Sequence, residues 1–290
     1  MIKVKKVNAF TDSKKGGNPA GVLLNSPDLS DSQMANITKK LGVSETAFVF
    51  PSNKADYLVK FFTPKIEVDL CGHATIATFF TIGEEGFFSK DKTIILTQET
   101  KVGILPVEIE FTIDKKVKRV MMGQDKTILK DIYLDISDIA DSLNVTLDKI
   151  DTTLPKQITS TGLFTLPICI NSFNTLKSIK PNFEKIKKIC FKFNIGSFHL
   201  FTFETLEPES VYHARNFAPI YAVNEDPVTG TANGAVCSFL LKNKIIQKSK
   251  MICEQGDIIG RPGRVFVEIK NDKVKVGGRA KIVEEIAINL

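Results

Sequence analysis

Two stretches of the chain share one order of polar and apolar positions. Each begins with a run in which apolar and polar side chains alternate, Asp56–Phe62 and Val211–Phe217, and such alternation predicts a β-strand with one buried face. A proline-containing loop follows each run and leads to a glycine, Gly72 or Gly230, after which the residues are apolar nearly all round a helix. Helices that are apolar on every face are usually buried, so each half of the chain is predicted to fold around a central helix.

The two stretches also match residue by residue at one offset. The differences 225 − 67, 230 − 72, 232 − 74 and 235 − 77 all equal 158. The matched residues are Glu67, Gly72, Ala74 and Ala77 in the first copy and Glu225, Gly230, Ala232 and Ala235 in the second. Repetition at a fixed offset is typical of a duplicated structural unit. We therefore predict two similar α+β domains, residues 1–117 and 118–290, with a cleft between them and the last strand packing back on the first domain.

Shorter patterns predict the remaining elements. A surface helix is expected over Ser30–Leu41, because Ser30 suits the N-cap and Gly42 follows the last apolar position. Further helices are expected over Ser137–Leu143 and Asn182–Phe191. Strands are expected at Lys3–Ala9, Ala20–Leu24, Glu45–Phe50, Thr93–Gln98, Leu166–Ile170, Phe198–Phe203, Met251–Glu254, Arg264–Lys270 and Lys273–Val276.

The repeated glycine turn predicts an anion site. Glycine at the first turn of a helix lets backbone N–H groups approach a ligand closely, and the helix N-terminus carries a partial positive charge of roughly +0.5. Two such termini facing each other would hold a carboxylate between Gly72 and His73 on one side and Gly230 and Thr231 on the other. The alternative is that both glycines only allow tight turns, and the repetition favours the binding site.

Composition narrows the function classes. The chain has 290 residues, of which 43% are hydrophobic, enough to fill real cores. No apolar run reaches the ~18 residues of a membrane span, and the first residues lack the apolar core of a secretory signal, so we expect a cytoplasmic protein without a membrane partner. The net charge of +6 comes from lysines scattered along the chain, and no basic cluster is interleaved with base-stacking aromatic residues, so no nucleic-acid partner is expected.

Cysteine and histidine are poorly arranged for metal binding or for a nucleophilic pair. The five cysteines include no C-x-x-C pair, which indicates reduced thiols rather than a disulfide framework or a zinc knuckle. None of the three histidines has a second ligand at i, i+4 spacing, so no metal site is expected. Cys71 and His73 stand two residues apart at the start of a helix, where such residues do not face each other. We predict that His73 instead donates a hydrogen bond or a proton to a bound anion, although a purely structural histidine is the alternative.

Glu45 is the candidate general acid and base. It precedes an apolar strand and is flanked by Ala47, Phe48 and Phe50, so its carboxylate is expected to be partly desolvated. Burial raises the pKa of a carboxyl group, which suits proton transfer near neutral pH. The alternative is a glutamate at a strand start that points into water.

The motifs together resemble a known family. "VSETAFVF", "DLCGHAT", "EDPVTG" and "EQGDIIGRPG" occur in the order typical of the PhzF-like phenazine-biosynthesis isomerases, and the resemblance spans nearly the whole chain. That family is similar in fold to diaminopimelate epimerase, which implies two pseudo-symmetric domains, each a curled, mostly antiparallel sheet around a central helix. The resemblance implies a homodimeric isomerase without a cofactor that moves a proton on a small unsaturated carboxylate. The residues that it implicates are Glu45 as general acid and base, His73 and Asp226 as assistants, Asn18 as a substrate contact, and Gly72, Gly230 and Thr231 as carboxylate ligands.

Two rival functions stay open. Related epimerases use two cysteines, one at each glycine turn, but the repeat mate of Cys71 is Thr229, since 71 + 158 = 229. A threonine hydroxyl is far less acidic than a thiol and does not serve as the second base. An amino-acid or hydroxy-acid epimerase that uses Cys71 with a different base is one rival. The other is a non-catalytic binding or scaffold protein that kept the fold.

Overall fold

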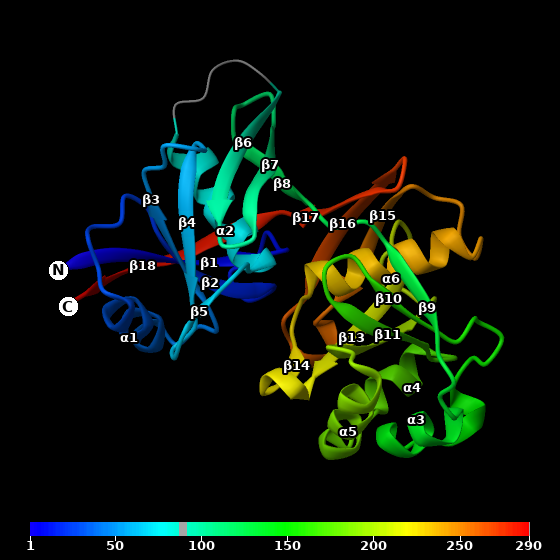
Figure 1. Cartoon of the computed structure of the whole chain (residues 1–290). Helices are drawn as coiled ribbons and strands as arrows, with labels where there is room; N and C mark the ends of the chain where they lie inside the picture. The colour runs from blue at the N-terminus through cyan, green and yellow to red at the C-terminus, as the bar shows by residue number, and fades with distance from the viewer. Residues whose placement is uncertain (87–91, 290) are drawn as a thin grey trace. The chain divides into compact units, whose positions relative to one another are not determined.

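The computed structural model describes residues 1–86 and 92–289 and divides into two units (Figure 1). Unit 1 comprises residues 1–123 and returns at Gly277, whereas unit 2 comprises Gln124–Val276. The boundary lies later than the sequence suggested, because β8 (Val117–Gly123) pairs with β7 (Gly103–Phe111) and so continues the sheet of unit 1.

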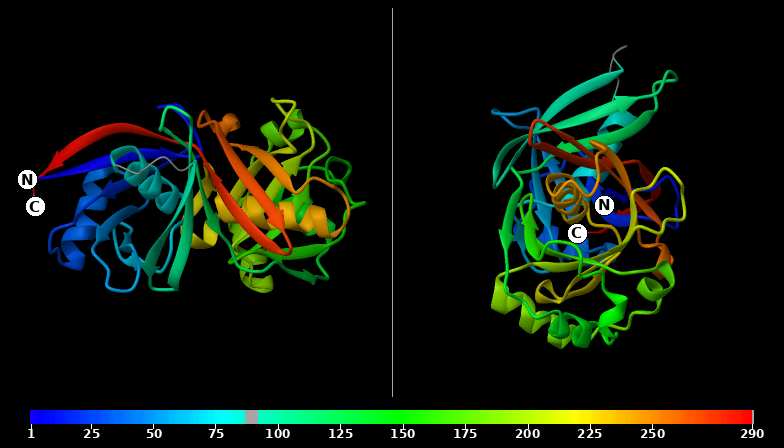
Figure 2. Two further views of the ribbon diagram at one scale, coloured as in Figure 1. Left: turned by 90° about the horizontal axis from the view of Figure 1, so that it is seen from above. Right: turned by 90° about the vertical axis from the view of Figure 1, so that its right-hand side faces the viewer.

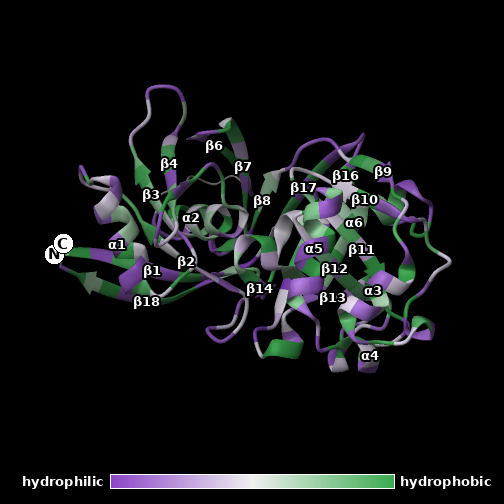
Figure 3. Cartoon of the chain, turned by 60° about the horizontal axis from the view of Figure 1, so that its bottom comes forward, coloured by the Kyte–Doolittle hydropathy of each residue, from purple (hydrophilic) through white to green (hydrophobic). Residues whose placement is uncertain are grey.

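The first and last strands of the chain lie together in unit 1. β18 (Ala280–Ile288) pairs antiparallel with β1 (Ile2–Ala9), so the two termini lie next to each other (Figure 2). Hydrophilic and hydrophobic residues both occur along β1 (Figure 3), and they alternate except at the adjacent Lys5 and Lys6. The remaining strands of unit 1 are β2 (Asn18–Leu23), β3 (Thr46–Phe50), β4 (Tyr57–Phe62), β5 (Glu67–Val68) and β6 (Thr93–Thr100).

Helix α2 (Gly72–Glu85) is the central helix of unit 1. Every residue from Ala74 to Gly83 is buried, and the helix contacts β1, β2, β3, β7, β8 and β18. Its threonines are compatible with burial because Thr75, Thr78 and Thr81 each donate a hydrogen bond to the backbone carbonyl four residues earlier. The surface helix α1 (Asp31–Leu41) follows its prediction, with Ser30 in a capping box and Gly42 in the left-handed conformation.

Unit 2 repeats this plan around α6 (Gly230–Lys242). Residues Ala232–Leu240 are all buried, and α6 contacts β10, β11, β12 and β16. The surface helices are α3 (Ile136–Leu143), α4 (Phe173–Ser178) and α5 (Phe183–Phe193). The strands are β9 (Ile128–Asp131), β10 (Gln157–Ser160), β11 (Phe164–Cys169), β12 (Ser197–Thr202), β13 (Tyr212–Ala218), β14 (Val223–Asp226), β15 (Lys250–Gln255), β16 (Gly263–Lys270) and β17 (Lys273–Gly278), which crosses the boundary.

The predicted fold class is confirmed. Both central helices begin at the repeated glycine, and each is preceded by a short strand, β5 or β14, that pairs antiparallel with the strand before it. Antiparallel pairing dominates both units, and the parallel pairs are β2–β3, β4–β6, β11–β12 and β13–β15. Among the described residues no helix is long and apolar enough to cross a membrane.

Candidate active site

Backbone pairing in unit 1 fixes the position of Glu45. The residue immediately precedes β3, and its carbonyl oxygen accepts a hydrogen bond from the Gly21 N–H on β2 at 3.0 Å. Thr46, Ala47 and Phe48, which follow it, are all buried. The Glu45 side chain itself is only 21% exposed, so it is partly desolvated and does not extend freely into water.

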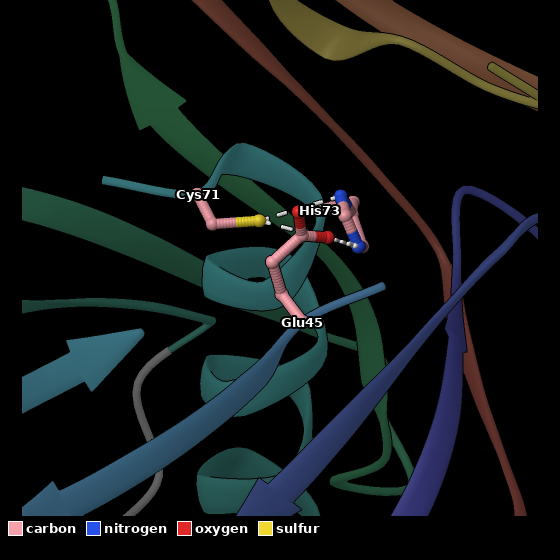
Figure 4. Close-up of side chains that lie close together, drawn as sticks. All are labelled: Glu45, Cys71 and His73. Atoms are coloured by element: carbon pink, nitrogen blue, oxygen red, sulfur yellow. Dashed lines mark hydrogen bonds and ion pairs between the residues drawn. The ribbon is translucent and has the colours of Figure 1, made fainter. Parts of the chain in front are cut away.

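The start of α2 places two further reactive groups beside that carboxylate. His73 lies in the first turn, and its Nε2 is 3.3 Å from Glu45 Oε2. Cys71 is the N-cap residue, and its Sγ is 3.4 Å from His73 Nδ1. Figure 4 shows the three side chains converging from the strand start and the helix start.

The prediction that Cys71 and His73 do not face each other is wrong. It treated both residues as helical, but the N-cap backbone at Cys71 is extended, with φ −138° and ψ 113°. An extended residue directs its side chain differently from a helical one, so the i, i+2 rule for helix surfaces does not apply at this junction. The sequence argument against a metal site considered only ligands at i, i+4 spacing. It does not apply here, because the fold brings Glu45, which is distant in sequence, next to His73. The carboxylate, thiol and imidazole ligand atoms lie within 4.8 Å of one another.

The environment of Glu45 also reverses the predicted direction of its pKa. Burial raises the pKa of the carboxyl group, as expected, but hydrogen bonding with His73 and the charge of that residue outweigh burial. Hydrogen bonds with Ser44 and Cys71 lower it further, so the Glu45 pKa lies below its ordinary value. At neutral pH the resting form is therefore the carboxylate, which can accept a proton.

The pKa values of His73 and Cys71 are both raised in this cluster. Burial lowers the pKa of His73, but the adjacent Cys71 sulfur and Glu45 carboxylate outweigh burial and raise it well above its ordinary value. Burial dominates at Cys71 and raises the pKa of the thiol. The charge of the Cys71 sulfur is the largest influence that raises the His73 pKa, so protonation of the thiol and of the imidazole is coupled beside the Glu45 carboxylate.

Unit 2 builds a second cluster at the start of α6. The Thr229 hydroxyl donates a hydrogen bond to the Asp226 carboxylate, three residues earlier. Thr229 occupies the N-cap, and Gly230 and Thr231 form the first turn. Thr161 holds this turn by donating from its hydroxyl to the Thr231 carbonyl at 3.3 Å.

Gln255 organises the second cluster and was not singled out from the sequence. Its Oε1 accepts hydrogen bonds from Thr229 N–H at 3.1 Å and from Asn233 Nδ2 at 2.7 Å. Its Nε2 donates to the Asp226 carbonyl at 2.9 Å and to Thr229 Oγ1 at 3.2 Å. The side chain is buried, so this amide ties the loop before α6 to β15. The signal in the sequence was the "EQG" triplet, which contributed to the family resemblance but had no assigned role.

The other predicted residues take the following places. Asn18 is buried at the start of β2, the strand next to β3. At Gly72 an added Cβ would meet only the Met122 sulfur, at 3.9 Å, among the described residues. Neither packing nor a left-handed backbone therefore requires glycine there.

The repeated glutamates are structural. Glu67 pairs with Lys101 at 2.8 Å, whereas Glu225 accepts two hydrogen bonds of 2.8 Å from the Arg215 guanidinium. Arg215 is buried and also donates to the Leu176 and Ile179 carbonyls. Carboxylates held in this way support the loops before the central helices.

Comparison with known proteins gives a consistent result. A family model described as phenazine biosynthesis-like protein, PhzC-PhzF, matches residues 7–286. The chain is 35% identical over 280 residues to the uncharacterized isomerase YfhB of Bacillus subtilis, covering 96% of this chain and 93% of that protein.

Solved structures agree with this match. The PhzF-family phenazine biosynthesis protein of Bacillus anthracis has a TM-score of 0.90 and 31% sequence identity, with coverage of 100% of this chain and 99% of that one. A hydroxyproline epimerase of Agrobacterium vitis shares the fold at a TM-score of 0.61 and 10% identity, covering 98% of this chain and 90% of that one.

Proposed function

This chain belongs to the phenazine biosynthesis-like family, PhzC-PhzF, and is an isomerase, and we propose that it moves a proton along a small unsaturated carboxylate with Glu45 as general acid and base. The observation that carries the proposal is the contact of 3.3 Å between the Glu45 carboxylate and the His73 imidazole. A partly buried carboxylate beside an imidazole whose pKa is raised combines a resident base with a hydrogen-bond donor for an anion.

The proposed reaction needs one base and no net electron transfer. Glu45 accepts a proton from a carbon of the substrate, and the electron pair of the broken C–H bond moves along the conjugated system. The protonated Glu45 then returns the proton to the other end of that system, which regenerates the carboxylate. Because atoms and electrons balance without an oxidant or reductant, no redox cofactor enters the proposal. Proton transfer by a positioned group typically contributes 10²- to 10⁴-fold to the rate.

We propose that Gly72 and Gly230, each at the first turn of the central helix of its unit, bind substrate carboxylate. The Thr229 side chain, at the N-cap of α6, makes no capping hydrogen bond to its helix. The absence of any packing demand for glycine at position 72 supports this role. Thr231 would add its backbone N–H to the second turn.

Asp226 and Asn18 complete the proposed site. Asp226 is oriented by the Thr229 hydroxyl and by the hydrogen bond from Gln255 to its carbonyl, so it has a defined position next to the second turn. We assign Asp226 to proton relay and Asn18 to substrate contact. These roles rest on the match of their motifs to the family.

Deuterium exchange tests the assignment of Glu45. A panel of unsaturated cyclic and acyclic carboxylates, including a dihydro-3-hydroxyanthranilate, is incubated in D₂O with wild type and with Glu45→Gln and followed by proton NMR. Deuterium should enter a substrate with wild type, and Glu45→Gln should be slower by about 10²- to 10⁴-fold. Glu99→Gln is the matched control, because Glu99 lies in unit 1 but bonds Ser52 and Lys54 instead. Full turnover in folded Glu45→Gln would refute the role of Glu45.

A Cys71-dependent epimerase is the second candidate, and the contact between Cys71 Sγ and His73 Nδ1 at 3.4 Å favours it. The raised pKa of the thiol argues against it, since the thiolate is the form that acts as a base. The two candidates predict opposite results in the same assay. Loss of exchange in Cys71→Ser with retention in Glu45→Gln would establish the epimerase chemistry instead.

A further inference from the structure

Glu45, Cys71 and His73 offer the three ligand types that zinc prefers. Zinc is bound in proteins by carboxylate oxygen, thiolate sulfur and imidazole nitrogen, and three protein ligands plus water make an open site. The side chains come from two elements, the residue before β3 and the start of α2, and their ligand atoms lie within 4.8 Å of one another. Within the described residues this is the one group of three such side chains close enough to share an ion.

The distances suit one small tetrahedral cation. In tetrahedral coordination, an oxygen and a nitrogen that each lie about 2.0 to 2.1 Å from the ion are about 3.3 Å apart. A nitrogen at that distance from the ion and a sulfur about 2.3 Å from the ion are about 3.6 Å apart. His73 Nε2 is 3.3 Å from Glu45 Oε2 and 4.0 Å from Cys71 Sγ. The first pair already has the required separation, and the second needs to contract by only a few tenths of an ångström.

We infer that a thiophilic divalent cation of the zinc class binds Glu45, Cys71 and His73 and competes with the substrate for this site. The side chains of Glu45 and His73 are 21% and 13% exposed, so a hydrated cation can reach them and keep water as its fourth ligand. Carboxylate and thiolate together neutralise two positive charges, which offsets the unfavourable position of a cation near a helix N-terminus. Sulfur and nitrogen donors select zinc or cobalt over magnesium and calcium.

The donors must be deprotonated for binding. Cys71 binds a metal ion as a thiolate and His73 binds through an unprotonated ring nitrogen, so any proton on these atoms passes to the buffer. Metal binding should therefore release protons and strengthen as the pH rises. The Glu45 lone pair that would accept the substrate proton is then held by the metal, so turnover stops. This inhibitory consequence rests on the proposed function, whereas the binding itself rests on the donor geometry alone.

Cobalt spectroscopy tests the binding without any substrate. Metal-free chain is titrated with Co²⁺, and one equivalent should produce a near-ultraviolet thiolate-to-cobalt charge-transfer band that excess Zn²⁺ removes and Mg²⁺ does not. Cys71→Ser should abolish the band. His73→Gln and Glu45→Gln should each weaken cobalt binding by at least 10- to 100-fold. Loss of a residue that only hydrogen-bonds to a metal ligand already weakens metal affinity by that factor, and loss of a ligand should weaken it no less.

A second sulfur pair supplies the control. Cys237 and Cys253 are buried in unit 2 with their sulfur atoms 3.3 Å apart, so they are the competing source of a cobalt–thiolate band. Cys237→Ser should leave the spectrum unchanged. A band that persists in Cys71→Ser, or that disappears in Cys237→Ser, would overturn the proposed site. Thermal unfolding of each variant confirms that the comparison is made between folded proteins.

The failure of this proposal is distinguishable from failure of the proposed function. Absence of the cobalt band in wild type together with Glu45-dependent deuterium exchange refutes the metal site and leaves the isomerase mechanism intact. A Cys71-dependent band without exchange in any carboxylate supports the metal site and counts against the mechanism. When both are observed, competitive inhibition of exchange by Zn²⁺ is expected, and unchanged exchange at saturating Zn²⁺ would overturn the inhibitory role.

Discussion

Replacing Glu45 by glutamine should lower the pKa of His73, and the structure sets the size of the change. The nearest carboxylate oxygen is 3.3 Å from His73 Nε2. Two unit charges at that distance interact by about 1.3 kcal/mol in a water-like dielectric and by about 5 kcal/mol at an effective dielectric of 20. At about 1.4 kcal/mol per pKa unit, these bounds correspond to a fall of about 1 to about 4 units. Both side chains retain some exposure, and glutamine keeps a carbonyl that accepts a hydrogen bond, so the result should lie near the lower bound.

NMR titration measures this change directly. The chain contains only three histidines, so three imidazole signals are followed in metal-free wild type and Glu45→Gln. His199 serves as the internal reference, because burial lowers its pKa to about 4 and it lies on β12 in unit 2. The raised pKa in wild type should belong to His73 and should disappear in His73→Gln. A His73 pKa that stays the same in Glu45→Gln would refute the carboxylate–imidazolium pair.

The same pair gives stability a defined pH dependence. The folded-state pKa of His73 is raised, so its contribution is complete below the ordinary histidine value of about 6.5 and is lost as pH rises through the folded pKa. The folded-state pKa of Glu45 is lowered, so its contribution is present above about 4.3 and is lost as pH falls through the folded value. The stability difference between wild type and Glu45→Gln should be largest between those two pH values. A difference that is constant from low to high pH would contradict the assigned protonation states.

Two further predictions concern residues around the turns. Gly72→Ala should fold with unchanged or higher stability, since alanine favours helix by about 1 kcal/mol, yet it should bind small carboxylates more weakly, which calorimetry measures. Gly83→Ala is the matched control within the same helix. Its added Cβ would lie 2.6 Å from a Val117 methyl group, so it should lower the free energy of unfolding by about 1 to 3 kcal/mol without a direct effect on carboxylate binding. Gln255→Leu leaves the partly buried Thr229 N–H without its acceptor and should lower the free energy of unfolding, measured in urea, by about 1 to 3 kcal/mol. Unchanged stability would exclude this role of Gln255.

Local pattern determined the framework of both units. The fixed offset of 158 residues identified the duplication, and the helices α2 and α6 begin at the glycines that it marks, Gly72 and Gly230. Ser30 and Gly42 bound α1 as predicted, because capping depends on residues within one helical turn. Features that depend only on nearby residues, such as hydrophobic periodicity and helix caps, can be predicted from the sequence alone.

The sequence predicted that the last strand packs back on the first domain, but it did not identify the partner strand. β18 joins β1 across nearly the whole chain, and a pair of adjacent glutamates, Glu284 and Glu285, interrupts its alternation. The glutamates lie opposite Lys6 and Lys5 in the pairing register. The polar positions of β18 are therefore explained by its partner strand, which only the tertiary structure identifies.

The sequence predicted which residues belong to the candidate site, but it did not predict their contacts or the directions of their pKa shifts. Motif resemblance selected Glu45 and His73, whereas their contact exists because β3 pairs with β2 while α2 packs across the same strands. The direction of the Glu45 pKa reversed because the imidazole outweighs burial, and Cys71 joined the cluster because its backbone is extended at the helix junction. Charge interactions fall off with distance through space and are independent of separation along the chain, so only the folded structure decides which of these groups act on each other.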